Sequence, residues 1–243
     1  MPTAIEKLGI LRILQEGELK IEGQFLRGSN YTFFGHASLD GDNISVVYKP
    51  VQGEQPLWDF PTRSLAKREA AAYIVSEALD WDLVPPTIYR KKGPLGPGSL
   101  QYYIVHDQDY HYFNFTPTDI QKLRVFVTFD IIVNNADRKG SHILKSADGH
   151  LFSIDHGVCF HCDDKLRTVI WDFSGESLPQ EITATLESFV DKLKNDENLI
   201  RDLRSQIKVS EIKALEKRTL NLLKSGIFPS PPNSGRPFPW PPV

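Results

Sequence analysis

Two polar segments contain residue types that could carry out chemistry. The first, residues 134–142, has a carboxylate at Asp137, a cation at Lys139 and an imidazole at His142. The second has Asp155 in the string Ile-Asp-His-Gly. Phosphoryl transfer requires a carboxylate near the accepting hydroxyl, ligands for a divalent cation, and positive charge near the phosphates. Each segment alone is equally consistent with a solvated turn, because aspartate side chains frequently close turns.

Two charged residues precede these segments in an informative order. Lys49 ends a β-branched run over residues 44–50, and Glu69 follows twenty residues later in a predicted helix. A strand lysine paired with a helical glutamate is the arrangement that holds phosphate oxygens in kinases. Singly, either residue is consistent with a solvated surface charge. Together with Asp137 and Asp155, they predict one site.

The elements that must position Lys49 and Glu69 are mainly strands. Alternating or β-branched apolar residues between turn residues predict strands. The predicted strands are residues 18–26, 31–37, 44–50, 84–89 and 99–105. A helix is predicted over residues 64–79, with Ser64 as its N-cap. We therefore expect a five-stranded antiparallel sheet with one helix inserted after the third strand.

The second half of the chain is expected to be mainly helical. Apolar periodicity and capping residues predict helices at residues 120–133, 181–194, 197–207 and 211–225. Two short strands, at residues 143–144 and 151–154, flank a turn and deliver Asp155 at their exit. The predicted fold class is α+β, with a first lobe at residues 1–105, a second lobe at residues 106–228 and a tail at residues 229–243.

The tail is rich in proline, with seven prolines in its fifteen residues. Such a segment favours an extended polyproline conformation. Two interpretations are open. The tail binds a partner protein through an aromatic groove of that partner, or it packs on its own domain or frays.

The composition excludes several classes of protein. The chain has 243 residues, of which 40% are apolar and 24% charged, and a net charge of −3. Acidic residues interrupt the basic ones, so no basic stripe predicts nucleic-acid binding. No apolar run approaches the roughly 18 residues that span a bilayer, and the first residues lack a signal-peptide pattern, so we expect a cytoplasmic protein.

Cys159 and Cys162 are consistent with a zinc or redox site, although the lack of a second pair of cysteines favours reduced thiols.

These segments resemble a known family. The strings at residues 135–144 and 153–160 resemble the catalytic and metal-binding segments of the phosphatidylinositol 3-/4-kinase superfamily, especially its type II phosphatidylinositol 4-kinases. Residues 49–69, with Leu83–Pro86 and Gly93–Gly98, resemble a bacterial phosphatidylinositol kinase-like family of untested substrate, and HipA-like kinases are more distantly similar. The resemblance covers roughly residues 15–225. It implies a two-lobed, protein-kinase-like fold that transfers the γ-phosphate of ATP to a hydroxyl of a lipid head group, a small molecule or a protein.

The resemblance also implies roles for individual residues. Lys49 would contact the α- and β-phosphates, Glu69 would orient Lys49, Asp137 would be the catalytic carboxylate and Asp155 would bind the metal. A turn covering the phosphates would consist of Arg27, Gly28, Ser29 and Asn30, and the adenine would lie against the strand end formed by Ile104, Val105 and His106. Lys139 is a candidate to stabilise the transferring phosphate. Arg138 either shares that role or pairs with a carboxylate of its lobe.

One departure from the family pattern concerns the metal. His142 stands where the superfamily usually has asparagine, five residues after the catalytic aspartate. Magnesium prefers oxygen ligands, whereas imidazole suits softer metals. His142 therefore either coordinates a softer metal, ligates Mg²⁺ poorly, or donates to phosphate. The expected cofactors are ATP with Mg²⁺ or Mn²⁺.

The resemblance leaves three functions open. The first is an ATP-dependent phosphotransferase. The second is a nucleotide-binding pseudokinase or an enzyme that transfers AMP, because the same residues would hold ATP. The third is a non-catalytic adaptor that binds a partner through the tail.

Overall fold

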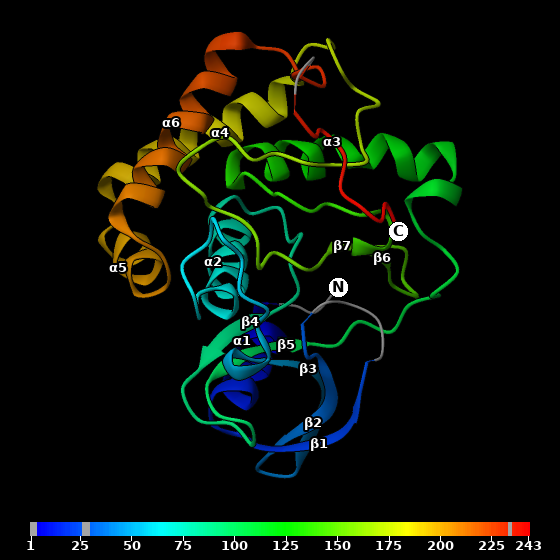
Figure 1. Ribbon diagram of the computed structural model, residues 1–243, viewed down its shortest axis with the longest axis vertical. Coiled ribbons are helices and arrows are strands. Elements are labelled where there is room, and N and C mark those ends of the chain that lie inside the picture. The colour runs from blue at the N-terminus through cyan, green and yellow to red at the C-terminus, as the bar shows by residue number, and fades with distance from the viewer. Residues whose placement is uncertain (1–3, 26–29, 233–234) are drawn as a thin grey trace.

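The computed structural model describes residues 4–25, 30–232 and 235–243. A β-sheet lies at one end of the molecule and most of the helices lie at the other (Figure 1). The residues predicted to form the site come from both ends. Their positions therefore depend on how the sheet and the helices are joined.

The sheet has the five antiparallel strands that the sequence predicts. They are β1 (Glu18–Gln24), β2 (Phe33–Leu39), β3 (Asp42–Pro50), β4 (Thr87–Arg90) and β5 (Gly98–Tyr102), in the order β1-β2-β3-β5-β4. In the central strand β3, Val46 and Tyr48 are buried in the core of the sheet. Successive side chains of a strand point to opposite faces, so Lys49 is directed away from that core.

The sheet is preceded by a helix, and this helix was not predicted from the sequence. Helix α1 (Ala4–Glu16) packs on the sheet through Ile13 and Leu14, which share a core cluster with Ala37 and Leu100. The apolar residues of this segment do recur at helical spacing. However, Gly9 lies at its centre, and glycine lowers helix propensity.

Helix α2 (Leu65–Ala78) follows β3, as predicted. Its predicted N-cap bond from Ser64 is wrong, because the Ser64 hydroxyl donates to the carbonyl oxygen of Pro61. The backbone of Ser64 is near-helical, which turns its hydroxyl away from the first turn. The Glu54 carboxylate instead accepts from the backbone N–H of Ala66 at 2.9 Å.

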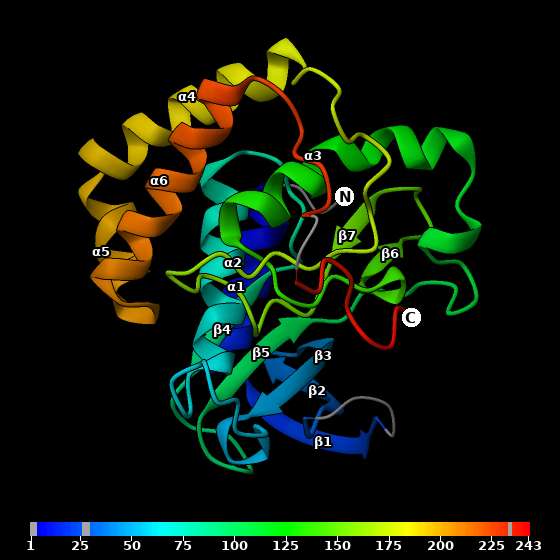
Figure 2. The ribbon, with the colours of Figure 1, turned by 45° about the horizontal axis from the view of Figure 1, so that its top comes forward.

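The other half is mainly helical. It contains α3 (Pro117–Val133), α4 (Gln180–Asn195), α5 (Glu197–Gln206), α6 (Val209–Ser225) and a hairpin of β6 (Ile143–Lys145) with β7 (Leu151–Ser153). Short 3-10 turns occur at Val51–Gly53, Tyr112–Asn114 and Gly140–His142. Figure 2 shows α4, α5 and α6 as a group beside α2. Helix α3 begins three residues earlier than predicted, because Thr116 caps it and Pro117 suits its first turn.

Helix α2 joins the two halves. Its Ala72, Val75 and Leu79 belong to the large core of the helical half, together with Leu123 and Phe129 of α3. On its other side, α2 contacts β4 and β5. In the described residues, no helix has the length and apolar character needed to cross a membrane.

Candidate active site

Lys49 connects the sheet to the helical half. Its Nζ lies 2.6 Å from Oε1 of Glu69 and 3.0 Å from Oδ1 of Asp155. Burial alone would lower the pKa of Lys49, but the adjacent carboxylates of Asp155 and Glu69 raise it above its ordinary value. The lysine is therefore a fixed positive charge. Three residues predicted to act together thus meet in the structure.

Glu69 holds two partners at once. One carboxylate oxygen contacts Lys49, and the other accepts from the backbone N–H of His156 at 2.9 Å. The side chain is almost completely buried, and this burial raises the pKa of Glu69 against the opposing effect of Lys49. Glu69 therefore fixes both the lysine and the backbone that follows Asp155.

Asp155 adopts an uncommon backbone conformation. It follows β7 and Ile154, and its φ of 63° lies in the left-handed region. For residues other than glycine this conformation costs free energy, and such strain tends to occur at functional sites. Although burial opposes it, the charge of Lys49 holds the pKa of Asp155 well below its usual range. The half-exposed carboxylate is therefore ionised and accessible.

The loop after α3 is held by two buried asparagines. Asn134 ends the helix with a φ of 58° and donates to the carbonyl oxygens of His161 and Asp163. The side chain of Asn135 accepts from the backbone N–H of Asp137 at 3.0 Å and donates to Asp130 at 2.9 Å. The position of Asp137 is therefore set by the end of α3.

Arg138 pairs with a carboxylate of its own lobe, as one of the two interpretations predicts. It makes two hydrogen bonds to Asp130, at 2.7 and 2.9 Å, and both side chains are fully buried. It also donates to the carbonyl oxygens of His142 and Ile154. One buried guanidinium thus ties the loop to the backbone before Asp155. The same group lies 2.9 Å from Nε2 of His156, which makes this histidine part of the support.

Asp137 and Lys139 lie together at the surface of this loop. Lys139 Nζ is 3.5 Å from Oδ2 of Asp137, and the Asp137 side chain is 36% exposed. Burial raises the pKa of Asp137 to about 6, with a further contribution from the charge of Asp155, and Lys139 opposes the rise. A carboxylate with such a pKa is able to exchange a proton near neutral pH.

His142 faces Asp155. Its Nε2 is 3.2 Å from Oδ2 of Asp155, and its Nδ1 is 3.4 Å from the backbone N–H of Lys139. Burial lowers the pKa of His142 to about 4, against the effect of Asp155, so the ring is neutral near pH 7. A neutral imidazole is able to ligate a metal.

The donor set fits a cation shared with a nucleotide. Among the described residues, no group of three or more His, Cys, Asp or Glu side chains is arranged to hold a metal ion. Asp155 and His142 offer one oxygen and one nitrogen side by side. Mg²⁺ is usually held by one or two protein ligands, with phosphate and water completing the coordination shell.

Cys159 is buried and Cys162 is exposed, and both are free thiols.

The turn predicted to cover the phosphates is described only at Asn30. Asn30 accepts from the backbone N–H of Gln55 at 2.7 Å, so it supports the loop before α2. Arg27, Gly28 and Ser29, predicted to cover the phosphates, lie outside the described residues.

The predicted adenine segment is not a strand end. Strand β5 ends at Tyr102, and the chain then leaves the sheet to form a bridge between His106 and Ser146. Ile104 is buried against Leu144 and Phe152. The chain leaves because it must cross from the sheet to the helical half at this point.

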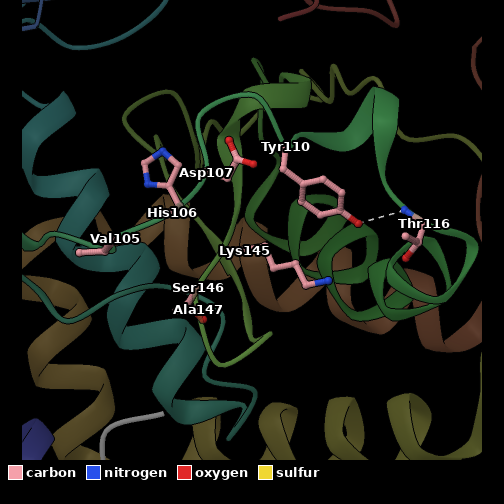
Figure 3. A pocket seen from close by; sticks show the side chains of 8 residues that line it. All are labelled: Val105, His106, Asp107, Tyr110, Thr116, Lys145, Ser146 and Ala147. Carbon is pink, nitrogen blue, oxygen red and sulfur yellow. Dashed lines mark hydrogen bonds between the residues drawn. The ribbon is translucent and has the colours of Figure 1, made fainter.

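A pocket of about 520 Å³ opens beside this crossing segment (Figure 3). It is lined by Val105, His106, Asp107, Tyr110, Thr116, Lys145, Ser146 and Ala147. Its lysine, Lys145, contacts the buried carboxylate of Asp119 at 2.6 Å. The side chains around Lys49 do not line it. The pocket is therefore adjacent to the predicted adenine segment and separate from the charged cluster.

Comparison with other proteins supplies the family. Residues 63–208 match the sequence profile of the family described as phosphatidylinositol 3- and 4-kinase. Protein Rv2133c of Mycobacterium tuberculosis is 37% identical over 264 aligned positions, which cover 94% of each chain. The chain belongs to the phosphatidylinositol 3- and 4-kinase family. The matched region of this family member includes Glu69, Asp137, His142 and Asp155.

Solved structures show that this family member has a kinase-like fold. The Golgi casein kinase with Mn/ADP bound has a TM-score of 0.60 at 14% identity, over 91% of this chain and 75% of that one. The Helicobacter pylori proinflammatory kinase CtkA has a TM-score of 0.53 at 11% identity, over 88% of this chain and 94% of that one. At these identities the likeness concerns the fold.

Sequence reasoning missed the buried residues that support the site. Asp130, Asn134 and Asn135 were assigned no role, although they position Asp137 and Arg138. A signal was present, because a carboxylate inside the apolar run Phe-Asp-Ile-Ile requires a buried partner. The partner of Asp130 is Arg138, eight residues later in the sequence.

Proposed function

We propose that the chain is an ATP-dependent phosphotransferase that transfers the γ-phosphate to a hydroxyl acceptor. The observation that carries the proposal is the position of Lys49 between Glu69 and Asp155, at 2.6 and 3.0 Å. The three residues come from a strand, a helix and a hairpin exit that are far apart in the sequence. A phosphate-binding site needs a fixed cation beside an ionised metal ligand, and this arrangement supplies both.

Each side chain has a distinct role in the transfer. Lys49 neutralises the phosphates that remain on the nucleotide, because its charge is fixed by two carboxylates. Asp137 accepts the proton of the attacking hydroxyl, and its raised pKa suits that exchange. Lys139, beside Asp137, stabilises the charge that develops on the transferring group.

Asp155 and His142 would hold a divalent cation together with the phosphates. The cation would supply charge neutralisation and orientation of the phosphate chain. Imidazole binds Mn²⁺ more readily than Mg²⁺. The Golgi casein kinase, which has the same fold, is described with manganese and ADP bound. These observations favour Mn²⁺ as the preferred ion of this chain.

The adenine would lie against the crossing segment. The backbone of Val105 and His106 would read the edge of the base, and the apolar side chains of Ile104, Leu144 and Phe152 would pack against its face. This part of the proposal rests on the family resemblance together with the apolar cluster.

The test identifies the nucleotide product. The full chain is incubated with ATP and either MgCl₂ or MnCl₂, with α-³²P-labelled ATP in one series and γ-³²P-labelled ATP in another. We expect ADP as the product and transfer of the γ-label. Transfer of the α-label would instead establish an AMP-transferring enzyme. If neither label is transferred but ATP and metal raise the melting temperature, the chain would be a nucleotide-binding pseudokinase.

A further inference from the structure

The end of the chain lies along the loop that contains Asp137. From α6 the chain passes α3 and ends near β6 in both views (Figures 1 and 2). The carbonyl oxygen of Pro237 accepts from the backbone N–H of Thr168 at 3.0 Å, and that of Pro242 accepts from the backbone N–H of Gly140 at 2.8 Å. Gly140 directly follows Lys139. Residues 235–243, called the strap below, therefore contact the candidate catalytic loop itself.

The strap lies against the segment that pairs with the loop. Arg138 of the loop pairs with the segment at residues 167–169 through backbone hydrogen bonds of 2.9 and 3.1 Å. Thr168 of that segment then donates to the strap on the other side. Main-chain donors along an edge are the usual means by which proteins bind an extended peptide. The surface that the strap covers at Gly140 and Thr168, called the groove below, thus offers main-chain donors to an extended chain.

The groove is narrow at Gly140. A Cβ atom added there would lie 2.7 Å from the ring of Phe113 and 3.6 Å from the carbonyl oxygen of Pro242. The glycine is needed because backbone and ring approach so closely. Phe113 is 53% exposed, and its ring lies against Gly140, whose N–H is bonded to the strap. A peptide in the groove would thus lie close to an aromatic side chain and to the backbone of Thr168.

The strap has the features of an occupant that is not itself phosphorylated. Its sequence, Gly-Arg-Pro-Phe-Pro-Trp-Pro-Pro-Val, contains no serine, threonine or tyrosine. It is held through main-chain bonds and the buried Pro239, whereas the side chains of Phe238 and Trp240 are 54% and 88% exposed. Among the described residues, two backbone bonds and one buried proline attach the strap to the loop and its neighbour.

We propose that this groove takes an extended polypeptide as the phosphate acceptor, and that the strap fills it as a displaceable internal inhibitor. The proposal rests on the proposed function, because it assigns the acceptor class of the same site. It predicts competition between strap and acceptor but not between strap and ATP. If the strap is docked in about nine molecules of ten, the apparent affinity for acceptor is reduced about tenfold.

The first test compares two full-length variants that each add one negative charge. Pro239→Asp places the charge at the buried position of the strap and should release it, whereas Trp240→Asp places it at the exposed position and serves as the control. Initial rates are measured with ATP and MnCl₂ at increasing concentrations of α-casein, an unstructured polypeptide rich in serine. We expect the KM for casein to fall about tenfold in Pro239→Asp only, with the KM for ATP unchanged.

The second test measures binding and does not depend on turnover. A fluorescent peptide with the sequence of residues 235–243 is titrated into the parent chain and into both variants, and anisotropy is recorded. The peptide should bind Pro239→Asp with a Kd about tenfold lower than its Kd for the parent and for Trp240→Asp, whose grooves are mostly filled. Melting curves of the three proteins check that each is folded.

Several results would overturn the inference. In a folded Pro239→Asp chain, these are an unchanged or raised KM for casein, no binding of the peptide, or phosphate transfer to phosphatidylinositol vesicles with none to casein. The peptide result also separates this inference from the proposed function. Peptide binding with no phosphate transfer by any variant would reject the phosphotransferase and keep the groove. Phosphate transfer without binding of the peptide would reject the groove and support the phosphotransferase.

Discussion

At the scale of single residues, the site is defined by how charge is fixed. Lys49 lies between a buried and a half-exposed carboxylate, so its charge does not depend on pH in the physiological range. Asp137 differs, because burial raises its pKa to about 6. His142 differs again, with its pKa lowered by burial to about 4. A cation, a titrating carboxylate and a neutral imidazole thus lie within one small region.

The pKa of Asp137 predicts a pH dependence. The carboxylate must be ionised to accept a proton, so activity should rise with pH and level off above about pH 6. For a pKa of about 6, kcat/KM at pH 5 should be about tenfold below its plateau. The measurement is a pH profile from 5 to 8 at saturating MnCl₂, with melting curves at each pH. A flat profile in a folded protein would show that Asp137 is not the titrating base.

The imidazole of His142 predicts a metal preference. In His142→Asn an amide oxygen replaces the ring nitrogen, and magnesium prefers oxygen. The ratio of activity with Mg²⁺ to activity with Mn²⁺ should rise about tenfold, the scale on which changes around metal ligands alter affinity. His36→Asn, on β2 and paired with Glu22 at 3.3 Å, is the matched control. Equal ratios in the parent and both variants would remove His142 from the metal site.

At the scale of elements, helix α2 is held to the helical half by a buried ion pair. Arg68 of α2 pairs with Glu211 of α6, and both are at most 5% exposed. Arg68 also donates to the carbonyl oxygen of Cys159, and Glu211 accepts from the backbone N–H of Lys208 at 2.8 Å. Because Glu69 is the next residue, this pair fixes the position of the glutamate that holds Lys49.

Loss of one partner of this pair should be costly. Glu211→Gln leaves the Arg68 charge buried without its counter-ion, and we expect a loss of about 3 kcal/mol in the free energy of unfolding. The matched control is Glu216→Gln on the same helix, whose pair with Lys194 is at 3.8 Å and partly exposed. That change should cost less than about 1 kcal/mol. Urea unfolding measures both, and equal losses would mean that the buried pair does not hold α2.

Local patterns predicted the elements well, and non-local contacts explain most of what they missed. The five strands and α2 to α6 follow from apolar periodicity and turn residues. The hydrogen bond that caps α2 could not be predicted from a local pattern, because its acceptor Glu54 lies outside the helix, in the preceding loop. The end of β5 at Tyr102 depends on the bridge from His106 to Ser146, which no local pattern encodes.

The site residues divide in the same way. Motif order predicted that Lys49, Glu69 and Asp155 would meet, and they do. The support from Asp130 and Asn135 depends on burial, which the sequence does not state directly.

At the scale of the whole molecule, the site lies where two cores meet. One core is formed by α1 and the sheet, and the other by α3 to α6 with the inner face of α2. Lys49 comes from the first half, and Asp137, His142 and Asp155 come from the second. A nucleotide between the halves would contact both, which is the usual position of a ligand between lobes. The strap contacts the second half, at Gly140 beside Lys139.

The most direct test of the central claim is transfer of the γ-phosphate by matched aspartate variants. Asp137→Asn keeps the size of the side chain and removes the proton acceptor, while Asp191→Asn makes the same change on the exposed face of α4. Transfer from γ-³²P-labelled ATP is measured for the parent and both variants with MnCl₂, and melting curves confirm folding. The account predicts a loss of at least about 100-fold in Asp137→Asn and unchanged transfer in Asp191→Asn. Parental transfer by a folded Asp137→Asn chain would contradict it.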